Sequence, residues 1–170
     1  MPDELQSFIH YWNHEAKKTT ELLRTLPTDQ YDFRPDPNAR SLGELSWHIA
    51  EVDAYTSYCI EQGKFEIGMR PPGIERPRSV EALAPGYERI HTDAVARIRK
   101  LTPADLDRRI RHITGDENSI RELLWNAILF HLIHHRGQLS ILARLAGGTV
   151  PGIYGPNREQ MAALRARLQA

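Results

Sequence analysis

Features that mark several classes of protein are missing from this sequence. Cys59 is the only cysteine among 170 residues, so no disulfide can form within the chain, which fits a reducing compartment. No apolar run approaches the roughly 20 residues that span a bilayer. The N-terminus has neither the basic nor the apolar segment of a signal peptide. We therefore expect a soluble, cytoplasmic protein without a membrane partner.

A charge excess is missing as well. The chain carries 22 basic and 22 acidic residues, and its formal net charge is zero. Nucleic-acid-binding domains need a positive surface to neutralise phosphates. The composition offers no argument for that function, and we expect a small-molecule substrate and no nucleic acid.

What the sequence does contain is apolar residues at helical spacing. This spacing predicts four long helices, over residues 3–26, 41–62, 79–101 and 119–146, and a short C-terminal helix over 157–168. Only residues 109–113 resemble a short extended piece. The connections are rich in proline and glycine and are long for helix–helix loops. The pattern predicts an all-α fold, a four-helix bundle with long connections, in a single domain over residues 1–170.

Two histidines stand where a bundle helix usually carries leucine. His131 and His135 are four residues apart, so they share one face of the predicted fourth helix. That face continues through Leu124, Ile128, Gln138, Leu142 and Leu145. Burying an imidazole is costly unless its ring nitrogens find partners. A divalent metal is one such partner, and a hydrogen bond to a backbone carbonyl or to Gln138 is another.

A third histidine lies on the predicted second helix. Ser41 and Glu44 form a capping-box pattern that opens this helix, and His48 follows on its inward face. Two histidines from one helix and one from another would leave a coordination position open, which is typical of a catalytic metal. The candidate metal ligands are therefore His48, His131 and His135.

Other histidines have simpler interpretations. His10 and His14 are also four apart, but they lie on the polar face of the first helix and are expected in solvent. His134 lies about 100° around its helix from His135, off the inward face.

Several residues near the candidate ligands have two open interpretations. Glu44 is explained by the capping box but could approach the metal. Gln138 is a candidate partner for a ligand ring, and Arg136 could bind a carboxylate or pair with another helix. Tyr154 could line the mouth of a pocket or pack against the bundle. Gly137 costs a helix interior about 1 kcal/mol, which close approach of a helix or substrate would explain.

The only thiol is not a candidate nucleophile. Cys59 lies about three helical turns from His48, roughly 16 Å away, too far for direct chemistry at the metal.

These residues together resemble a known family. The sequence His131-x3-His135-Arg136-Gly137-Gln138 is similar to the HxxxHRGQ signature of the DinB/YfiT-like metalloenzymes. The segment around Ser41 and His48 and the trailing Val150–Gly155 also match. The resemblance covers about residues 35–156, and the first helix fits by pattern alone.

The resemblance implies a bundle with up-down-down-up connectivity, a divalent metal held by the three histidines, and a homodimer. It also implies a metal-dependent enzyme that uses a low-molecular-weight thiol, as an S-transferase or isomerase. The chemistry of histidine ligands favours Zn, Ni or Fe as the metal, and a metal held by three histidines could equally activate a water, which would make the enzyme a hydrolase. One alternative is a non-enzymatic bundle that binds a metal or small ligand. Another is an interaction module whose histidines bind no metal.

Overall fold

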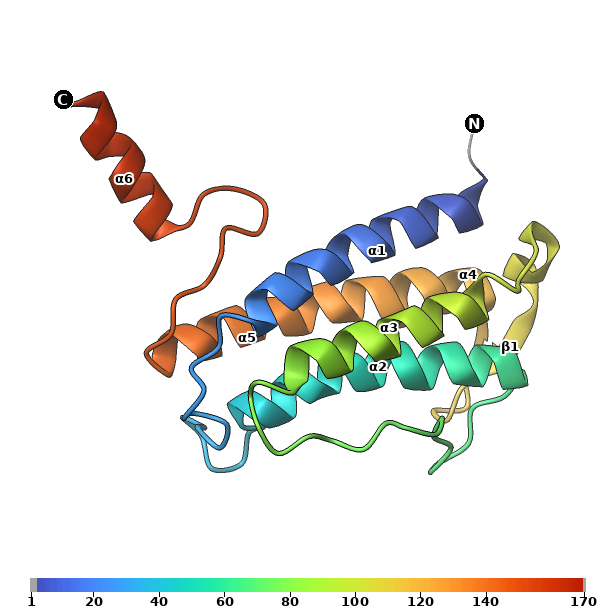
Figure 1. Ribbon diagram of the computed structural model, residues 1–170. Coiled ribbons are helices and arrows are strands. Elements are labelled where there is room, and N and C mark those ends of the chain that lie inside the picture. Colours follow the sequence, from blue (N-terminus) through green and yellow to red (C-terminus); the bar gives the residue numbers. More distant parts are fainter. Residues whose placement is uncertain (1–2, 170) are drawn as a thin grey trace.

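The computed structural model describes residues 3–169. Four long helical stretches lie side by side as a bundle (Figure 1). They are α1 (Glu4–Leu23), α2 (Leu42–Gln62), α3 (Leu83–Ile98) and a composite of α4 (Ile120–Glu122), η2 (Leu123–Phe130) and α5 (His131–Leu145). This arrangement confirms the predicted four-helix bundle.

The helices follow the up-down-down-up order. In Figure 1, α1 and α5 run in one direction, whereas α2 and α3 run in the other. Because α2 and α3 are parallel neighbours, the chain must return along the whole bundle between them. With 21 residues, α2 is about 32 Å long at 1.5 Å per residue. This return path accounts for the long connection over residues 63–82.

Three predicted helix boundaries were wrong by about a turn. Helix α1 ends at Leu23 and not near residue 26, although Leu26 remains buried. Helix α3 runs from Leu83 to Ile98 and not from Ser79 to residue 101. Proline is tolerated only in the first turn of a helix because it lacks the N–H that later positions donate. The later start places Pro85 in that first turn.

A small hairpin interrupts the helical architecture. Strand β1 (Arg109–Arg111) pairs antiparallel with β2 (Glu117–Ser119), with Ile110 opposite Asn118. The extended piece predicted near residue 109 is therefore confirmed, but its partner strand was not predicted. A 3-10 turn, η1 (Pro103–Asp107), precedes the hairpin.

The buried face of α5 differs from the predicted one. Leu132, His135, Arg136, Leu139, Leu142 and Ala143 are buried, so the face centres on Leu139. Gln138 and Leu145, which we placed on the inward face, are exposed. The helix is rotated so that Arg136 is buried against Glu15 of α1, and this rotation moves Gln138 and Leu145 outward.

The last helix, α6 (Arg158–Leu168), stands apart from the bundle (Figure 1) and has no buried residue over its described length. Among the described residues, no helix combines the length and the apolar character needed to cross a membrane.

Candidate metal centre

The structure brings the three candidate histidines together. One ring nitrogen from each of His48, His131 and His135 lies within 4.8 Å of the others. The Nε2 atoms of His131 and His135 are 2.7 Å apart. The ring of His48 lies 4.6 Å from that of His135, centroid to centroid. Histidines from two helices therefore converge on one point.

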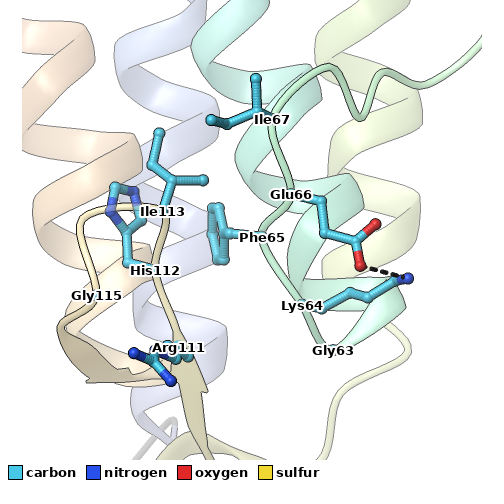
Figure 2. A pocket seen from close by; sticks show the side chains of 9 residues that line it. All are labelled: Gly63, Lys64, Phe65, Glu66, Ile67, Arg111, His112, Ile113 and Gly115. Carbon is cyan, nitrogen blue, oxygen red and sulfur yellow. Dashed lines mark hydrogen bonds and ion pairs between the residues drawn. The ribbon is translucent and has the colours of Figure 1, made fainter.

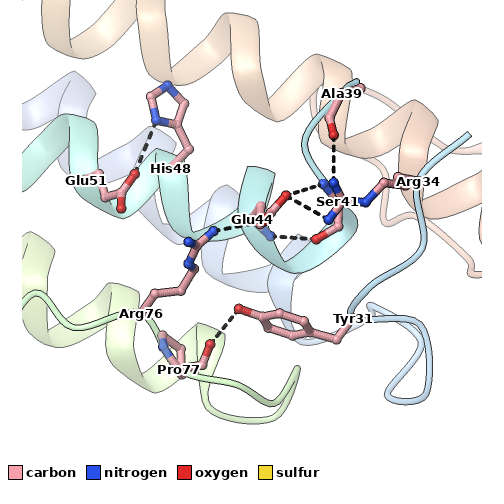
Figure 3. Close-up of polar contacts among 9 residues, drawn as sticks. All are labelled: Tyr31, Arg34, Ala39, Ser41, Glu44, His48, Glu51, Arg76 and Pro77. Carbon is pink, nitrogen blue, oxygen red and sulfur yellow. Dashed lines mark hydrogen bonds and ion pairs between the residues drawn. The ribbon is translucent and has the colours of Figure 1, made fainter. Parts of the chain in front are cut away.

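Capping interactions fix the start of the helix that carries His48 (Figure 3). The Glu44 backbone N–H donates to the Ser41 hydroxyl at 3.2 Å, and the Ser41 N–H donates to the Glu44 carboxylate at 2.9 Å. Arg34 and Arg76 also contact this carboxylate. The hydrogen bond from Ser41 lowers the Glu44 pKa. The capping-box interpretation of Glu44 is therefore confirmed.

A π-helical segment leads directly into His131. Residues Leu123–Phe130 form a π-helix, and α5 starts at His131. Short π-helical turns are rare and frequently lie at functional sites. Leu124 and Ile128 of this segment are buried. The segment therefore joins the core of the bundle to the histidine cluster.

Outer partners orient two of the three rings. The Nδ1 atom of His48 lies 3.4 Å from Oε2 of Glu51 (Figure 3). The Nδ1 atom of His135 lies 2.7 Å from Oε1 of Gln138. An acceptor at Nδ1 places the ring proton there and leaves the lone pair on Nε2, which is how ligand histidines are held at metal sites. Glu51 was not predicted from the sequence, although its i, i+3 spacing from His48 places the two side chains on one face of α2.

The electrostatics of the cluster favour neutral imidazoles. Burial lowers the pKa of His131, with a further contribution from His48. Burial likewise lowers the pKa of His135 to about 4. The neutral ring is the form that binds a metal. Three imidazole ligands suit Zn, Ni or Fe, so the donor set fits the divalent ion that the sequence predicted.

Arg136, beside the ligand candidate His135, is buried and faces α1. Its guanidinium donates to the Glu15 carboxylate at 2.5 Å and to the Tyr154 hydroxyl at 2.6 Å. Burial raises the pKa of Glu15, but hydrogen bonds from Tyr154 and Arg136 outweigh it and hold this pKa below its ordinary value. Arg136 therefore pairs with another helix, and Tyr154 ties the C-terminal loop to the bundle.

The cluster opens on one side into a chamber. A cavity of about 400 Å³ is lined by His48 and His131 together with Glu51 and mostly apolar side chains. Its size lies within the usual range for small-molecule sites, about 300–1,000 Å³. A ligand in the chamber would therefore reach the cluster directly.

The other predicted histidines are exposed. His10 and His14 lie on α1, whereas the ring of His134 lies 5.0 Å from that of His135, centroid to centroid, beside the cluster. A second group of buried polar side chains, which was not predicted from the sequence, lies between α2 and α3. The Nδ1 atom of His91 is 2.9 Å from the Asp53 carboxylate. The Trp12 indole N–H donates to the same carboxylate at 3.2 Å, so this group is satisfied internally.

The chain belongs to the DinB superfamily, whose sequence profile matches residues 11–139. It is 31% identical over 162 residues to the YrdA protein of Bacillus subtilis (strain 168), covering 93% of this chain and 92% of YrdA. The YjoA protein of the same organism is 29% identical over 152 residues, covering 85% and 91%.

Solved structures share the fold. A DinB-like protein from Bacillus cereus ATCC 10987 superposes with a TM-score of 0.71 at 29% identity, covering 88% of this chain and 97% of that one. Bacillus subtilis YfiT, described as a probable metal-dependent hydrolase with an unusual four-helix bundle topology, gives a TM-score of 0.67 at 14% identity, covering 86% and 93%. At that identity YfiT shares the fold alone.

Proposed function

We propose that this protein is a divalent-metal-dependent enzyme in which His48, His131 and His135 hold the ion. The nucleophile comes from solution, as a water or a low-molecular-weight thiol, and the reaction is hydrolysis or thiol transfer to a small molecule. The metal is Zn, Ni or Fe.

One observation carries this proposal: the histidine cluster opens into the chamber. His48 and His131 contribute to the chamber wall as well as to the cluster. Structural metal sites are closed by four protein ligands, whereas catalytic sites keep a position free for water or substrate. The open side supports an enzyme over a bundle that binds a metal only for stability.

The chain itself has no thiol ready for this chemistry. Burial raises the pKa of Cys59 to about 11, so its sulfur stays protonated near neutral pH. A bound divalent ion lowers the pKa of a water or thiol and polarises an electrophile. Glu51 holds the His48 ring from its Nδ1 side, and Gln138 does the same for His135.

The two nucleophiles have different support. YfiT is described as a probable metal-dependent hydrolase, which supports water through a shared fold. The motif resemblance supports the thiol. Both fit a site of three histidines with an open position.

Elemental analysis of protein purified without a His-tag tests whether the chain binds a metal. The wild type is compared with His48→Ala, His131→Ala and His135→Ala. We expect about one ion per chain, lost in all three variants and retained in His134→Ala, the exposed neighbour. Wild-type protein without metal after incubation with Zn and Ni would overturn the proposal.

Metal-loaded protein is then assayed with activated esters and with electrophiles plus a thiol. Turnover that depends on the thiol identifies a transferase, and turnover without it a hydrolase.

We also propose that the protein is a homodimer, as the resemblance implies. The outer face of α5 and the adjoining end of η2 support this state, because Ile141 and Leu145 of α5 and Phe130 of η2 expose more than half of their surface. Large exposed apolar side chains gathered on one face are typical of interaction surfaces.

A further inference from the structure

We propose that the chamber beside the histidine cluster binds an apolar alkyl or aryl group of the substrate. The substrate is then a small molecule that carries such a group next to the bond that reacts at the metal. This inference rests on the proposed function, because it places the reacting bond at the cluster.

The chamber wall is apolar over most of its extent. Val52 and Tyr55 line it from α2, and Ala127 lines it from η2. Ile74 and Met69 line it from the connection between α2 and α3. An apolar wall gains by burying apolar ligand surface, at about 25 cal/mol per Å² removed from water.

Glu51 and Arg70 are the acidic and basic side chains on the chamber wall. Glu51 already engages His48 through one carboxylate oxygen. Arg70 lines the chamber from the loop. Because Glu51 and Arg70 are opposite in sign, the wall has no excess of one charge to recruit an ionic group, and its apolar side chains dominate.

Two long connections build the roof of the chamber. Figure 2 shows Phe65 and Ile67 of the α2–α3 connection close to His112 and Ile113 at the hairpin tip. The Phe65 and His112 rings are 5.0 Å apart, centroid to centroid. Ile67 is 92% exposed and Ile113 50% exposed. All four side chains line cavities at this point, so the rim itself presents apolar surface to a ligand.

The connection is anchored at several points along α2. The Trp47 indole N–H donates to the Ile74 carbonyl at 3.1 Å. The Cys59 sulfur lies 3.5 Å from the Met69 sulfur, and the Tyr55 and Phe65 rings are 5.7 Å apart. Loops longer than about 12–15 residues in compact domains are commonly functional. These contacts hold the loop over the chamber, so the site is formed before ligand arrives.

A series of alkyl hydroxamic acids tests this inference. The hydroxamate group binds the metal in every member, and only the length of the alkyl group changes along the series. Dissociation constants are measured by calorimetry for acetohydroxamic, butanohydroxamic, hexanohydroxamic and octanohydroxamic acid on metal-loaded protein. Each methylene that enters the chamber should tighten binding about fourfold, the factor that corresponds to about 0.8 kcal/mol per buried CH₂.

Two variants locate the effect in the chamber. Ala127→Leu fills it and should abolish the gain with chain length while leaving acetohydroxamic acid binding unchanged. Ile74→Ala removes wall contact and should weaken only the longer acids. Ala96→Leu, the same change at an exposed position of α3, is the matched control. Thermal unfolding of each variant checks that it folds.

The outcomes separate the two proposals. Metal-loaded protein that binds every acid equally, or whose chain-length gain survives both chamber variants, would overturn this inference alone. Protein with neither metal nor affinity for any hydroxamate would overturn the proposed function, and this inference with it.

Discussion

Arg136 on α5 and Glu15 on α1 form a buried ion pair one residue along the chain from the candidate ligand His135. The Arg136 side chain is 2% exposed and that of Glu15 is 9% exposed. The guanidinium also donates to the Glu15 backbone carbonyl at 3.0 Å. The pair therefore fixes the rotation of α5 against α1, and with it the direction in which His135 points.

Breaking this pair should be costly. Arg136→Met leaves the Glu15 carboxylate buried without its cation, and we expect the free energy of unfolding to fall by about 3–5 kcal/mol. Glu15→Leu in the same chain removes the stranded charge, so the double variant should recover much of the loss. Urea unfolding followed by circular dichroism measures both. Arg144→Met, which removes an exposed pair with Glu159, should leave stability unchanged. Equal destabilisation of the single and double variants would show that packing, and not charge, is responsible.

Acid should destabilise the metal-free protein through His135. Its pKa is about 4 in the folded chain because burial disfavours the charged ring, against about 6.5 when unfolded. Between these values the unfolded chain binds more protons, so stability falls as the pH drops from about 6.5 to 4 and is unaffected by this group above that window. Urea unfolding in chelator at several pH values measures the slope. His135→Asn should have a shallower slope in this window, and parallel curves would contradict the assignment.

Glu51 should raise the affinity for the metal, because it orients the ring of His48. Glu51→Gln weakens the acceptor at Nδ1 of His48, and loss of such partners typically lowers metal affinity 10–100-fold. Competition with a chromophoric chelator measures the dissociation constant for Zn or Ni. Glu61→Gln, a change on the same helix at a residue that pairs with Lys100, is the control. An unchanged constant in Glu51→Gln would mean that this carboxylate does not position the ligand.

Two helical glycines should respond to alanine in opposite directions. A Cβ at Gly43 would lie 2.3 Å from the Tyr31 ring, which is held by a hydrogen bond from its hydroxyl to the Pro77 carbonyl at 2.5 Å. Gly43→Ala should therefore cost about 1–3 kcal/mol through overpacking. A Cβ at Gly137 meets no described atom within 4 Å beyond its own helix turn, so Gly137→Ala should raise stability by up to about 1 kcal/mol. Thermal unfolding compares the two, and a loss in Gly137→Ala would point to a contact outside the single chain.

The proposed homodimer should depend on the outer face of α5. Ile141→Glu places a charge at a side chain that is 66% exposed in the single chain, so it should leave folding intact while preventing association. Sedimentation velocity at micromolar concentration should give a dimer for the wild type and a monomer for the variant. A wild type that sediments as a monomer would refute the dimer, and a dimeric variant would place the interface elsewhere.

Local sequence patterns are sufficient to predict the helices and the histidine pair on α5. The capping boxes at Ser41 and Ser119 act within three residues, and apolar periodicity acts within two helical turns. The pairing of His131 with His135 is likewise a property of one helix. Short-range effects of this kind can be read along the chain, which is why the helices and the His131–His135 pair were predicted. The grouping with His48 was predicted from its inward position and the family resemblance, and the connectivity from the resemblance alone.

The contacts that support the cluster, and the chamber onto which it opens, depend on how distant segments pack together. The Arg136–Glu15 pair joins residues 121 positions apart, and the bond between Tyr154 and Glu15 joins residues 139 apart. The chamber forms only where a loop and a hairpin tip meet over two helices. The rotation of α5 also depended on packing, since Gln138 lies outside the buried face that its spacing suggested. Contacts between distant segments depend on how whole helices pack, and no local pattern in the sequence records that packing.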